Sequence, residues 1–135
     1  MPTPIKHICY ADDDADDHLI FSIVLNEEFP SIKYELFYYC EDLLKYLNSP
    51  ENPLPDVIFL DYNMIGNTGN QCLREIKKTP GLMHLPVIIY STSKYDVIQN
   101  QCYRDGAYKY LVKAPEMGDV KKNLKSIISE IESSS

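Results

Sequence analysis

The sequence predicts an α/β fold, a single doubly wound sheet of five parallel strands with helices on both faces. Short apolar runs alternate with longer amphipathic segments five times along the chain, which is the pattern of repeated strand–helix units. The run DVIFL at 56–60 is almost entirely apolar, as expected of a central strand covered on both sides. A length of 135 residues allows one compact core but not two. We therefore expect one domain over 1–135, with its core at about 5–132 and no output domain.

The first half of the chain supplies four of the expected elements. The apolar run at 5–11 is expected to be a strand and the segment at 16–29 a helix, which Pro30 ends. An aromatic-rich strand is expected at 34–39, followed by a short helix at 41–47 and the proline-rich loop SPENPLP. The first helix is expected to turn an apolar stripe to the core, formed by Leu19, Ile20, Ile23 and Val24.

The second half continues the alternation. Strands are expected at 56–60, 86–90 and 108–112. Helices are expected at 71–78, 94–105 and about 115–132. Gly106 ends the second of these helices. The last helix has one clean apolar face, formed by Val120, Leu124, Ile127, Ile128 and Ile131, and the serines after it are expected to form a frayed tail.

Composition narrows the class of function. The net charge of -7 argues against non-specific nucleic-acid binding, because the phosphate backbone attracts basic surfaces. No apolar run is long enough to span a bilayer, and the N-terminus lacks the pattern of a signal peptide. We therefore expect a cytoplasmic protein without a membrane or nucleic-acid partner.

The four cysteines are widely spaced, at Cys9, Cys40, Cys72 and Cys102, and form no C-x-x-C pair. Metal-binding cysteines usually come in closely spaced pairs, and cytosolic thiols are usually reduced. We therefore expect reduced, mostly buried thiols rather than a disulfide or a zinc site.

Polar residues follow four of the five predicted strands. The first strand is followed by Asp12, Asp13 and Asp14, and the third by Asp61. Ser91 and Thr92 follow the fourth strand, and Lys113 follows the fifth. Ligands of open parallel sheets bind beyond the carboxyl ends of the strands, so these side chains are candidates for one site.

The residue types at these ends suit phosphoryl transfer. Clustered carboxylates repel one another, and a divalent cation with oxygen ligands, such as Mg²⁺, relieves the repulsion. A carboxylate beside Mg²⁺ can attack a phosphoryl group, while a lysine and a hydroxyl hold the other phosphoryl oxygens. Each residue also has an ordinary explanation by itself: the acidic run as a helix cap at Asp14 or Asp16, Asp61 as a turn residue, the serines as a cap, and Lys113 as a surface lysine.

Together the segments ICYADDD, DVIFLDYNM, PVIIYSTS and YLVKAP resemble the receiver domains of two-component response regulators, of the stand-alone, chemotaxis-receiver type. The resemblance covers nearly the whole chain and implies a flavodoxin-like sheet with strand order 2-1-3-4-5. It implies that Asp61 is the phospho-acceptor, and that Asp12 and Asp13 hold Mg²⁺ together with Asp61. By the same resemblance the remaining roles fall to Asn63 (a backbone carbonyl ligand of the metal), Ser91 (the switch hydroxyl), Lys113 (the phosphoryl-binding lysine) and Tyr110 (the switch aromatic).

The sequence departs from the family pattern at two positions. The family usually has a proline shortly after the acceptor, where this chain has Ile65, so a less rigid loop is expected. The family lysine is usually followed by a proline with a cis peptide bond, whereas Ala114 follows Lys113. A cis bond to alanine costs about 3 kcal/mol more than the trans form, so a rearranged connection is expected.

The resemblance implies a phosphorylation switch. A sensor histidine kinase or a phosphotransfer protein would supply the phosphoryl group, and an unidentified downstream protein would respond. The domain would assist its own phosphorylation without being an enzyme that acts on an outside substrate. A homodimer through the fourth helix and fifth strand is left open. The tyrosines of that region, Tyr103 and Tyr108, are expected to be partly buried rings, and Tyr38, Tyr39, Tyr46 and Tyr95 to be packing residues.

Two alternative functions stay open from the sequence. One is a phosphate-independent, receiver-like module that binds proteins, which the changes at Ile65 and Ala114 keep in view. The other is a phosphatase with an aspartyl nucleophile. Enzymes of that kind usually carry a second aspartate two residues after the nucleophile, where this chain has Asn63.

Overall fold

The computed structural model describes residues 3–64, 66 and 68–134. Within that part the strands are β1 (His7–Ala11), β2 (Lys33–Phe37), β3 (Val57–Asp61), β4 (Val87–Ser91) and β5 (Lys109–Val112). The helices are α1 (Ala15–Glu28), α2 (Cys40–Asn48), α3 (Gly69–Lys78), α4 (Asp96–Arg104) and α5 (Met117–Ser134). All neighbouring strands are parallel, in the order β2-β1-β3-β4-β5. The α/β prediction and the strand order implied by the resemblance are both confirmed.

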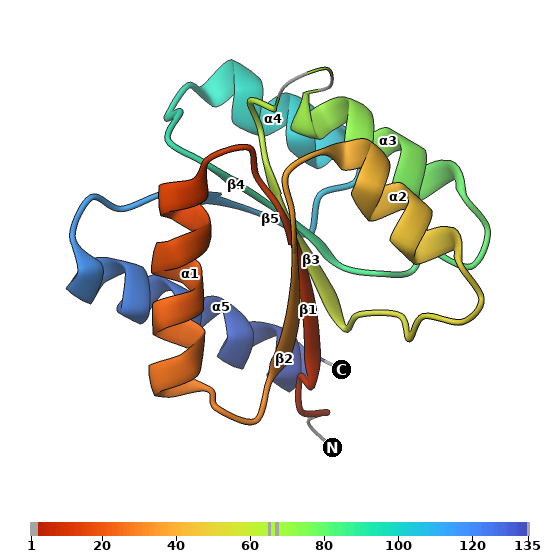
Figure 1. Ribbon diagram of the computed structural model, residues 1–135. Coiled ribbons are helices and arrows are strands. Elements are labelled where there is room, and N and C mark those ends of the chain that lie inside the picture. The colour runs from red at the N-terminus through yellow and green to blue at the C-terminus, as the bar shows by residue number, and fades with distance from the viewer. Residues whose placement is uncertain (1–2, 65, 67, 135) are drawn as a thin grey trace.

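The helices form two layers, one on each face of the sheet (Figure 1). Helices α1 and α5 cover one face, and α2, α3 and α4 cover the other. Successive side chains of a strand point to opposite faces, so alternate residues of β3 enter different cores. Ile58 and Leu60 pack under α2 and α3, whereas Val57 and Phe59 pack under α1 and α5. All five residues of β3 are buried, as expected of its central position.

Strand register brings the candidate residues to one edge of the sheet. Ala11 pairs with Leu60 and Asp61 pairs with Tyr90, so the carboxyl ends of β1, β3 and β4 lie level. Ser91 pairs with Val112, the last residue of β5, and Lys113 follows it directly. Asp61 and Ser91 are the last residues of their strands rather than the first residues after them. The strand register therefore fixes the positions of these residues relative to one another at the carboxyl edge of the sheet.

Helix α1 turns a different face to the core than its sequence suggested. Asp14 caps the helix and accepts hydrogen bonds from the backbone N–H groups of Asp16 and Asp17, so the capping part of the interpretation holds. The buried residues are His18, Phe21, Val24 and Leu25. Leu19 is 59 % exposed, so the expected stripe was wrong on that side. Packing against β1, where Phe21 meets Tyr10, selects the face.

The C-terminal serines were expected to fray, and that expectation was wrong for Ser133 and Ser134. Helix α5 runs to Ser134. The Ser133 hydroxyl donates to the Ser129 carbonyl at 2.9 Å, and the Ser134 hydroxyl donates to the Ile131 carbonyl at 3.1 Å. These local bonds continue the helix after its last apolar residue. No helix among the described residues is both long enough and apolar enough to cross a membrane.

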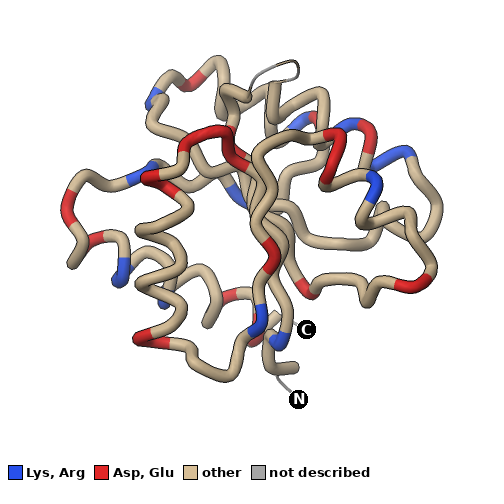
Figure 2. The backbone as a smooth tube through the Cα atoms, in the orientation of Figure 1, with Lys and Arg blue, Asp and Glu red and all other residues tan. Residues whose placement is uncertain are grey.

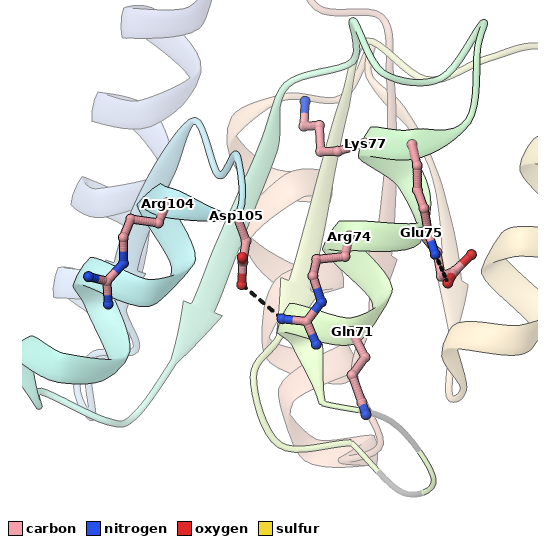
Figure 3. Close-up of a pocket in the computed structure, with 7 residues that line it drawn as sticks. Gln71, Arg74, Glu75, Lys77, Arg104 and Asp105 are labelled. Carbon is pink, nitrogen blue, oxygen red and sulfur yellow. Dashed lines mark hydrogen bonds and ion pairs between the residues drawn. The ribbon is translucent and has the colours of Figure 1, made fainter.

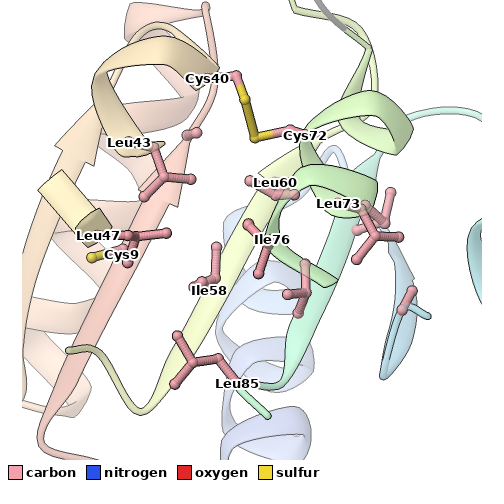
Figure 4. Close-up of a cluster of buried hydrophobic side chains, with 14 of the residues drawn as sticks. Cys9, Cys40, Leu43, Leu47, Ile58, Leu60, Cys72, Leu73, Ile76 and Leu85 are labelled. Atoms are coloured by element: carbon pink, nitrogen blue, oxygen red, sulfur yellow. A yellow bond between two sulfur atoms is a disulfide. The ribbon is translucent and has the colours of Figure 1, made fainter. Parts of the chain in front are cut away.

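Two of the four cysteines form a disulfide, contrary to expectation. Cys40 at the start of α2 is bonded to Cys72 in α3, with their Cα atoms 5.9 Å apart (Figure 4). Both lie in the core under α2 and α3, beside Leu43 and Leu73. Cys9 and Cys102 are buried free thiols, as predicted. Sequence spacing could not reveal the pair, because 32 positions separate residues that only the packing of two helices brings together.

Candidate functional site

Three carboxylates converge at the carboxyl end of the sheet. Asp12 follows β1, Asp13 follows it, and Asp61 ends the neighbouring strand β3. One oxygen from each lies within 4.8 Å of the others, which is close enough for one metal ion to contact all three. Asp12 is fully buried and Asp61 is 7 % exposed. The acidic segment between β1 and α1 is also visible as a concentration of negative charge at the top of α1 (Figure 2).

Lys113 reaches into this group of carboxylates from the end of β5. Its Nζ atom donates to Asp12 Oδ2 at 2.7 Å, to Asp17 Oδ2 at 2.8 Å and to Asp61 Oδ1 at 3.1 Å. It also lies 5.5 Å from the centre of the Tyr90 ring. The Lys113 backbone N–H donates to the Ser91 carbonyl at 2.7 Å, which fixes where the side chain starts. Three acceptors therefore hold the ammonium in place.

Asp17 and Tyr10 belong to the site, although the sequence interpretation did not single them out. Asp17 lies in the first turn of α1 and shares Lys113 with Asp12. The Tyr10 hydroxyl donates a very short hydrogen bond to Asp12 Oδ2. The alternation of side chains along a strand could have indicated Tyr10, because residues two apart face the same side. Nothing in the acidic run distinguishes Asp17 from its neighbours.

Burial and charge oppose each other at Asp61. Burial raises the pKa of Asp61 to about 6, because it removes water from the carboxylate, and the nearby Lys113 only partly counters this. Burial by itself would lower the pKa of Lys113, but hydrogen bonds to Asp12 and Asp17 outweigh it and raise that pKa. Lys113 is therefore permanently charged at neutral pH. Three carboxylates around one ammonium leave an excess of negative charge, which suits a divalent cation.

Ser91 and Tyr110 are linked through the backbone of Ser93. The Ser91 hydroxyl oxygen accepts from the Ser93 N–H at 3.1 Å, and the Ser93 carbonyl accepts from the Tyr110 hydroxyl at 2.9 Å. Ser91 is fully buried, and Tyr110 is buried in the core beneath α4. The Tyr110 N–H in turn donates to the hydroxyl oxygen of Tyr103 at 3.0 Å. Two hydrogen bonds through Ser93 therefore connect Ser91 to Tyr110, and a third connects Tyr110 to Tyr103.

Two connections next to the site depart from the usual family sequence, one after Asp61 and one after Lys113. Asn63, two residues after Asp61, is exposed and forms an antiparallel bridge with Thr68. Ile65 lies outside the described residues. The peptide bond between Lys113 and Ala114 is trans, and Lys113 still reaches the carboxylates. A proline with a cis bond is thus not needed to place the lysine in this chain.

A hollow lies between α3 and α4, and none of the acidic-pocket residues lines it (Figure 3). Its volume is about 670 Å³, and its lining is mostly charged: Gln71, Arg74, Glu75, Lys77, Lys78, Arg104 and Asp105. Arg74 donates to Asp105 across it at 3.0 Å, and Asn70 donates to the same carboxylate at 2.8 Å. These bonds join the two helices. We assign this hollow a structural role.

Comparison with known proteins identifies the family. The family model described as the response regulator receiver domain matches residues 8–125. The chain belongs to this family. Two-component response regulator ORR13 of Oryza sativa subsp. japonica is 31% identical over 121 residues, covering 90% of this chain and 97% of that protein. ORR12 of the same subspecies is 29% identical with the same coverage.

Solved receivers share the architecture. The phosphorylated cyanobacterial phytochrome response regulator RcpA superposes with a TM-score of 0.87 at 23% identity, over 97% of this chain and 96% of its own, which shows the shared fold. The Mn²⁺-bound form of response regulator Rcp1 has a TM-score of 0.79 at 25% identity, over 95% of this chain and 92% of its own.

The protein is therefore a two-component response regulator receiver with an acidic pocket of Asp12, Asp13 and Asp61 and a lysine at Lys113. A receiver is a signalling protein rather than a classical enzyme, and its membership of a two-component system implies a histidine kinase or phosphotransfer partner. The acidic triad is suited to a metal ion.

Proposed function

We propose that the receiver accepts a phosphoryl group on Asp61 from a histidine kinase or phosphotransfer protein, with Mg²⁺ as the cofactor. The observation that carries this proposal is the convergence of three carboxylates and Lys113 at one edge of the sheet. Each of the ordinary explanations, a helix cap or a surface lysine, would leave these groups apart. Lys113 is instead largely buried and bonded to three acidic residues.

The donor set fits a hard divalent cation. Asp12, Asp13 and Asp61 would each offer a carboxylate oxygen. The resemblance to receivers adds the backbone carbonyl of Asn63 as a further ligand. Oxygen ligands with open positions for water suit Mg²⁺. The Mn²⁺-bound structure of Rcp1 supports a divalent ion in a related receiver. When bound, the ion would offset the negative charge of the phosphoryl oxygens.

The transfer requires an ionised Asp61. One carboxylate oxygen attacks the phosphorus of a phosphohistidine, the bond from phosphorus to the imidazole nitrogen breaks, and the imidazole leaves as the neutral base after taking up a proton. With a pKa of about 6, Asp61 is mostly ionised at neutral pH and more basic than an ordinary aspartate. Lys113 can move from Asp61 to a phosphoryl oxygen while Asp12 and Asp17 keep it in the site. The partner's phosphohistidine supplies the phosphoryl group, and Asp61 retains it.

Phosphorylation then alters the chain of contacts that starts at Ser91. If the Ser91 hydroxyl turns to a phosphoryl oxygen, the Ser93 N–H loses its acceptor. The same residue holds the Tyr110 hydroxyl through its carbonyl, so Tyr110 is released to change rotamer. Ser91 and Tyr110 are in this way the two ends of the proposed switch.

The surface over α4 is the proposed output. Tyr95, the N-cap residue of α4, is 75 % exposed, Val97 is 77 % exposed and Tyr103 is 44 % exposed. The expectation of a packing residue was wrong for Tyr95, whereas Tyr103 and Tyr108 are partly buried as expected, Tyr38 packs against the His18 ring and Tyr46 packs against the core. An exposed aromatic and apolar group of this kind is suited to protein binding. We assign this surface to a downstream protein, with a second copy of the chain as the competing occupant.

We also propose that the chain acts in the cytoplasm as one domain.

The test is the intact mass of the protein after incubation with acetyl phosphate, with and without Mg²⁺. The wild type should gain one phosphoryl group only with Mg²⁺, and Asp61→Asn should gain none. Asp42→Asn, an exposed aspartate on α2, is the matched control and should behave as the wild type. Absence of an adduct on folded, Mg²⁺-loaded protein would instead favour phosphate-independent binding. Continuous release of phosphate from small esters would favour a phosphatase.

A further inference from the structure

The disulfide joins the first turns of two helices. Cys40 is the first residue of α2, and Cys72 is the fourth residue of α3. The N-terminus of a helix carries a partial positive charge, which favours a thiolate over a thiol. A thiolate at such a place is also a good leaving group in thiol–disulfide exchange. The helix N-termini therefore favour the thiolates that reduction would form, whereas the burial of both sulfur atoms means that α2 and α3 must separate before a reductant reaches the bond.

The two free cysteines lie in contrasting places. Cys9 is in the middle of β1, where burial raises the pKa of its thiol to about 12. Cys102 is near the C-terminal end of α4, where burial, followed by the charge of Asp105, raises the thiol pKa to about 11. The Cys102 thiol donates to Asn70 Oδ1 at 2.8 Å. Both are protonated and unreactive at neutral pH, so they serve as internal controls.

The disulfide closes a covalent loop that contains one of the three carboxylates of the acidic pocket. The loop of residues 40–72 contains Asp61 and Asn63. Just before the loop, the Phe37 carbonyl accepts from the Asp12 N–H at 2.9 Å. Reduction of the disulfide would therefore remove the covalent link between the two ends of a segment that contains Asp61.

The α3 end of the loop lies directly against Asp61. The Gly69 N–H donates to the Tyr62 carbonyl at 2.6 Å. A Cβ atom at Gly69 would lie 2.6 Å from the Asp61 carbonyl oxygen, which shows how closely the first turn of α3 approaches the acceptor. Cys72 is one turn further along the same helix. A shift of α3 would therefore displace the backbone of Asp61, because the two are in direct contact.

Few other interactions hold α2 and α3 together. Among the residues that the structure describes, no hydrogen bond or ion pair connects the two helices. Their remaining contact is apolar and includes Leu43, Leu47, Leu73 and Ile76 (Figure 4). Apolar contacts are non-directional and permit small slides, whereas a disulfide fixes the separation of its two ends.

We propose that Cys40 and Cys72 form a reversible dithiol–disulfide couple that regulates the metal affinity of the acidic pocket. The oxidised form holds α3 against Asp61 and binds Mg²⁺ more tightly. A dithiol reductant breaks the S–S bond by delivering two electrons and two protons, which leaves two thiols on the protein. The reductant loses the same two electrons and two protons and closes its own disulfide. The inference rests on the proposed metal site but not on transfer to Asp61.

The couple is tested on the full chain with Cys9→Ala and Cys102→Ala, so that Cys40 and Cys72 supply the remaining thiols. Samples are equilibrated at a series of ratios of reduced to oxidised dithiothreitol, quenched in acid, unfolded and alkylated, and then weighed intact. We expect no alkylation at the oxidising end and two alkylations at the reducing end, in one reversible step. Two alkylations under strongly oxidising conditions would overturn the proposal.

Metal affinity is then measured by calorimetry on the oxidised and reduced forms. Reduction should weaken Mg²⁺ binding about fivefold, a coupling typical of linked sites. Because linkage is reciprocal, saturating Mg²⁺ should make the midpoint potential about 20 mV more negative. The variant Cys40→Ser with Cys72→Ser should resemble the reduced form under all conditions. Circular dichroism of that variant and of reduced wild type checks that both remain folded.

The outcomes separate this inference from the proposed function. Equal Mg²⁺ affinities for folded oxidised and reduced protein would overturn the inference, even if Asp61 is phosphorylated in both forms. Weaker Mg²⁺ binding by the reduced form would support the inference, even if acetyl phosphate gives no adduct in either form, and tighter binding by the reduced form would overturn it. The lack of an acetyl phosphate adduct would contradict only the proposed phosphoryl transfer to Asp61.

Discussion

Replacement of Asp61 by asparagine should stabilise the metal-free protein at neutral pH. Burial raises the pKa of Asp61 from 3.8 to about 6 in the folded state. Because the folded-state pKa lies above the unfolded one, the folded state binds the extra proton between these values. The resulting stability is present below about pH 4 and is lost as the pH rises through about 6. A shift of about two units corresponds to about 3 kcal/mol, which ionised Asp61 costs the wild type at pH 7.

Asp61→Asn removes this cost, because its amide does not ionise. Urea unfolding in a chelator should show the variant about 3 kcal/mol more stable than wild type near pH 7, and less than about 1 kcal/mol more stable near pH 4. Mg²⁺ at 100 times its dissociation constant should add about 2.7 kcal/mol to the wild type and shrink the difference. Asp42→Asn, on the exposed side of α2, should change stability by less than about 0.5 kcal/mol at either pH. If the stability advantage of Asp61→Asn over wild type did not increase between pH 4 and pH 7, the reasoning would be refuted, since burial would then not raise the pKa of Asp61.

Three further predictions concern the residues around the site. Gly69→Ala should cost about 2 kcal/mol or more in urea unfolding, because the new Cβ would meet the Asp61 carbonyl oxygen at 2.6 Å; Gly118→Ala, with open space around its Cβ, should be neutral or stabilising by up to about 1 kcal/mol. Tyr10→Phe removes a donor to buried Asp12 and should lower the free energy of unfolding by about 1 to 3 kcal/mol; an unchanged unfolding midpoint would show that this bond adds nothing. Reduction of the disulfide between α2 and α3 should lower the free energy of unfolding by about 3 to 4 kcal/mol, as expected for a loop closed over a separation of 32 residues, and equal urea midpoints with and without reductant would contradict this.

The strand ends were predictable because they depend on local pattern. The apolar runs fix where each strand lies, and a parallel sheet brings all carboxyl ends to one edge. Asp12, Asp61, Ser91 and Lys113 follow or end such runs, so their shared edge could be read from the order of elements. The capping of α1 by Asp14 was predictable for the same reason, since a cap is made within four residues.

Contacts between distant elements were not predictable in this way. The burial of Phe21 rather than Leu19 on α1 depends on how the helix is rotated against β1. The engagement of Lys113 by Asp17 depends on the direction in which that helix leaves the sheet. Exposed tyrosines such as Tyr95 look like core residues in a sequence, because the same ring suits a core and a binding surface.

The sequence by itself determined the α/β alternation, the order of chemical groups along the strand ends and the resemblance to receivers. Only the tertiary structure decided that Asp61 is buried enough to hold its proton to about pH 6, because burial is a sum over neighbours from several elements. It also decided that Cys40 meets Cys72, since a disulfide needs two Cα atoms within about 7 Å and the chain between them gives no sign of that approach. Local periodicity fixes elements, whereas the packing of elements fixes distances, and the chemistry of this site depends on distances.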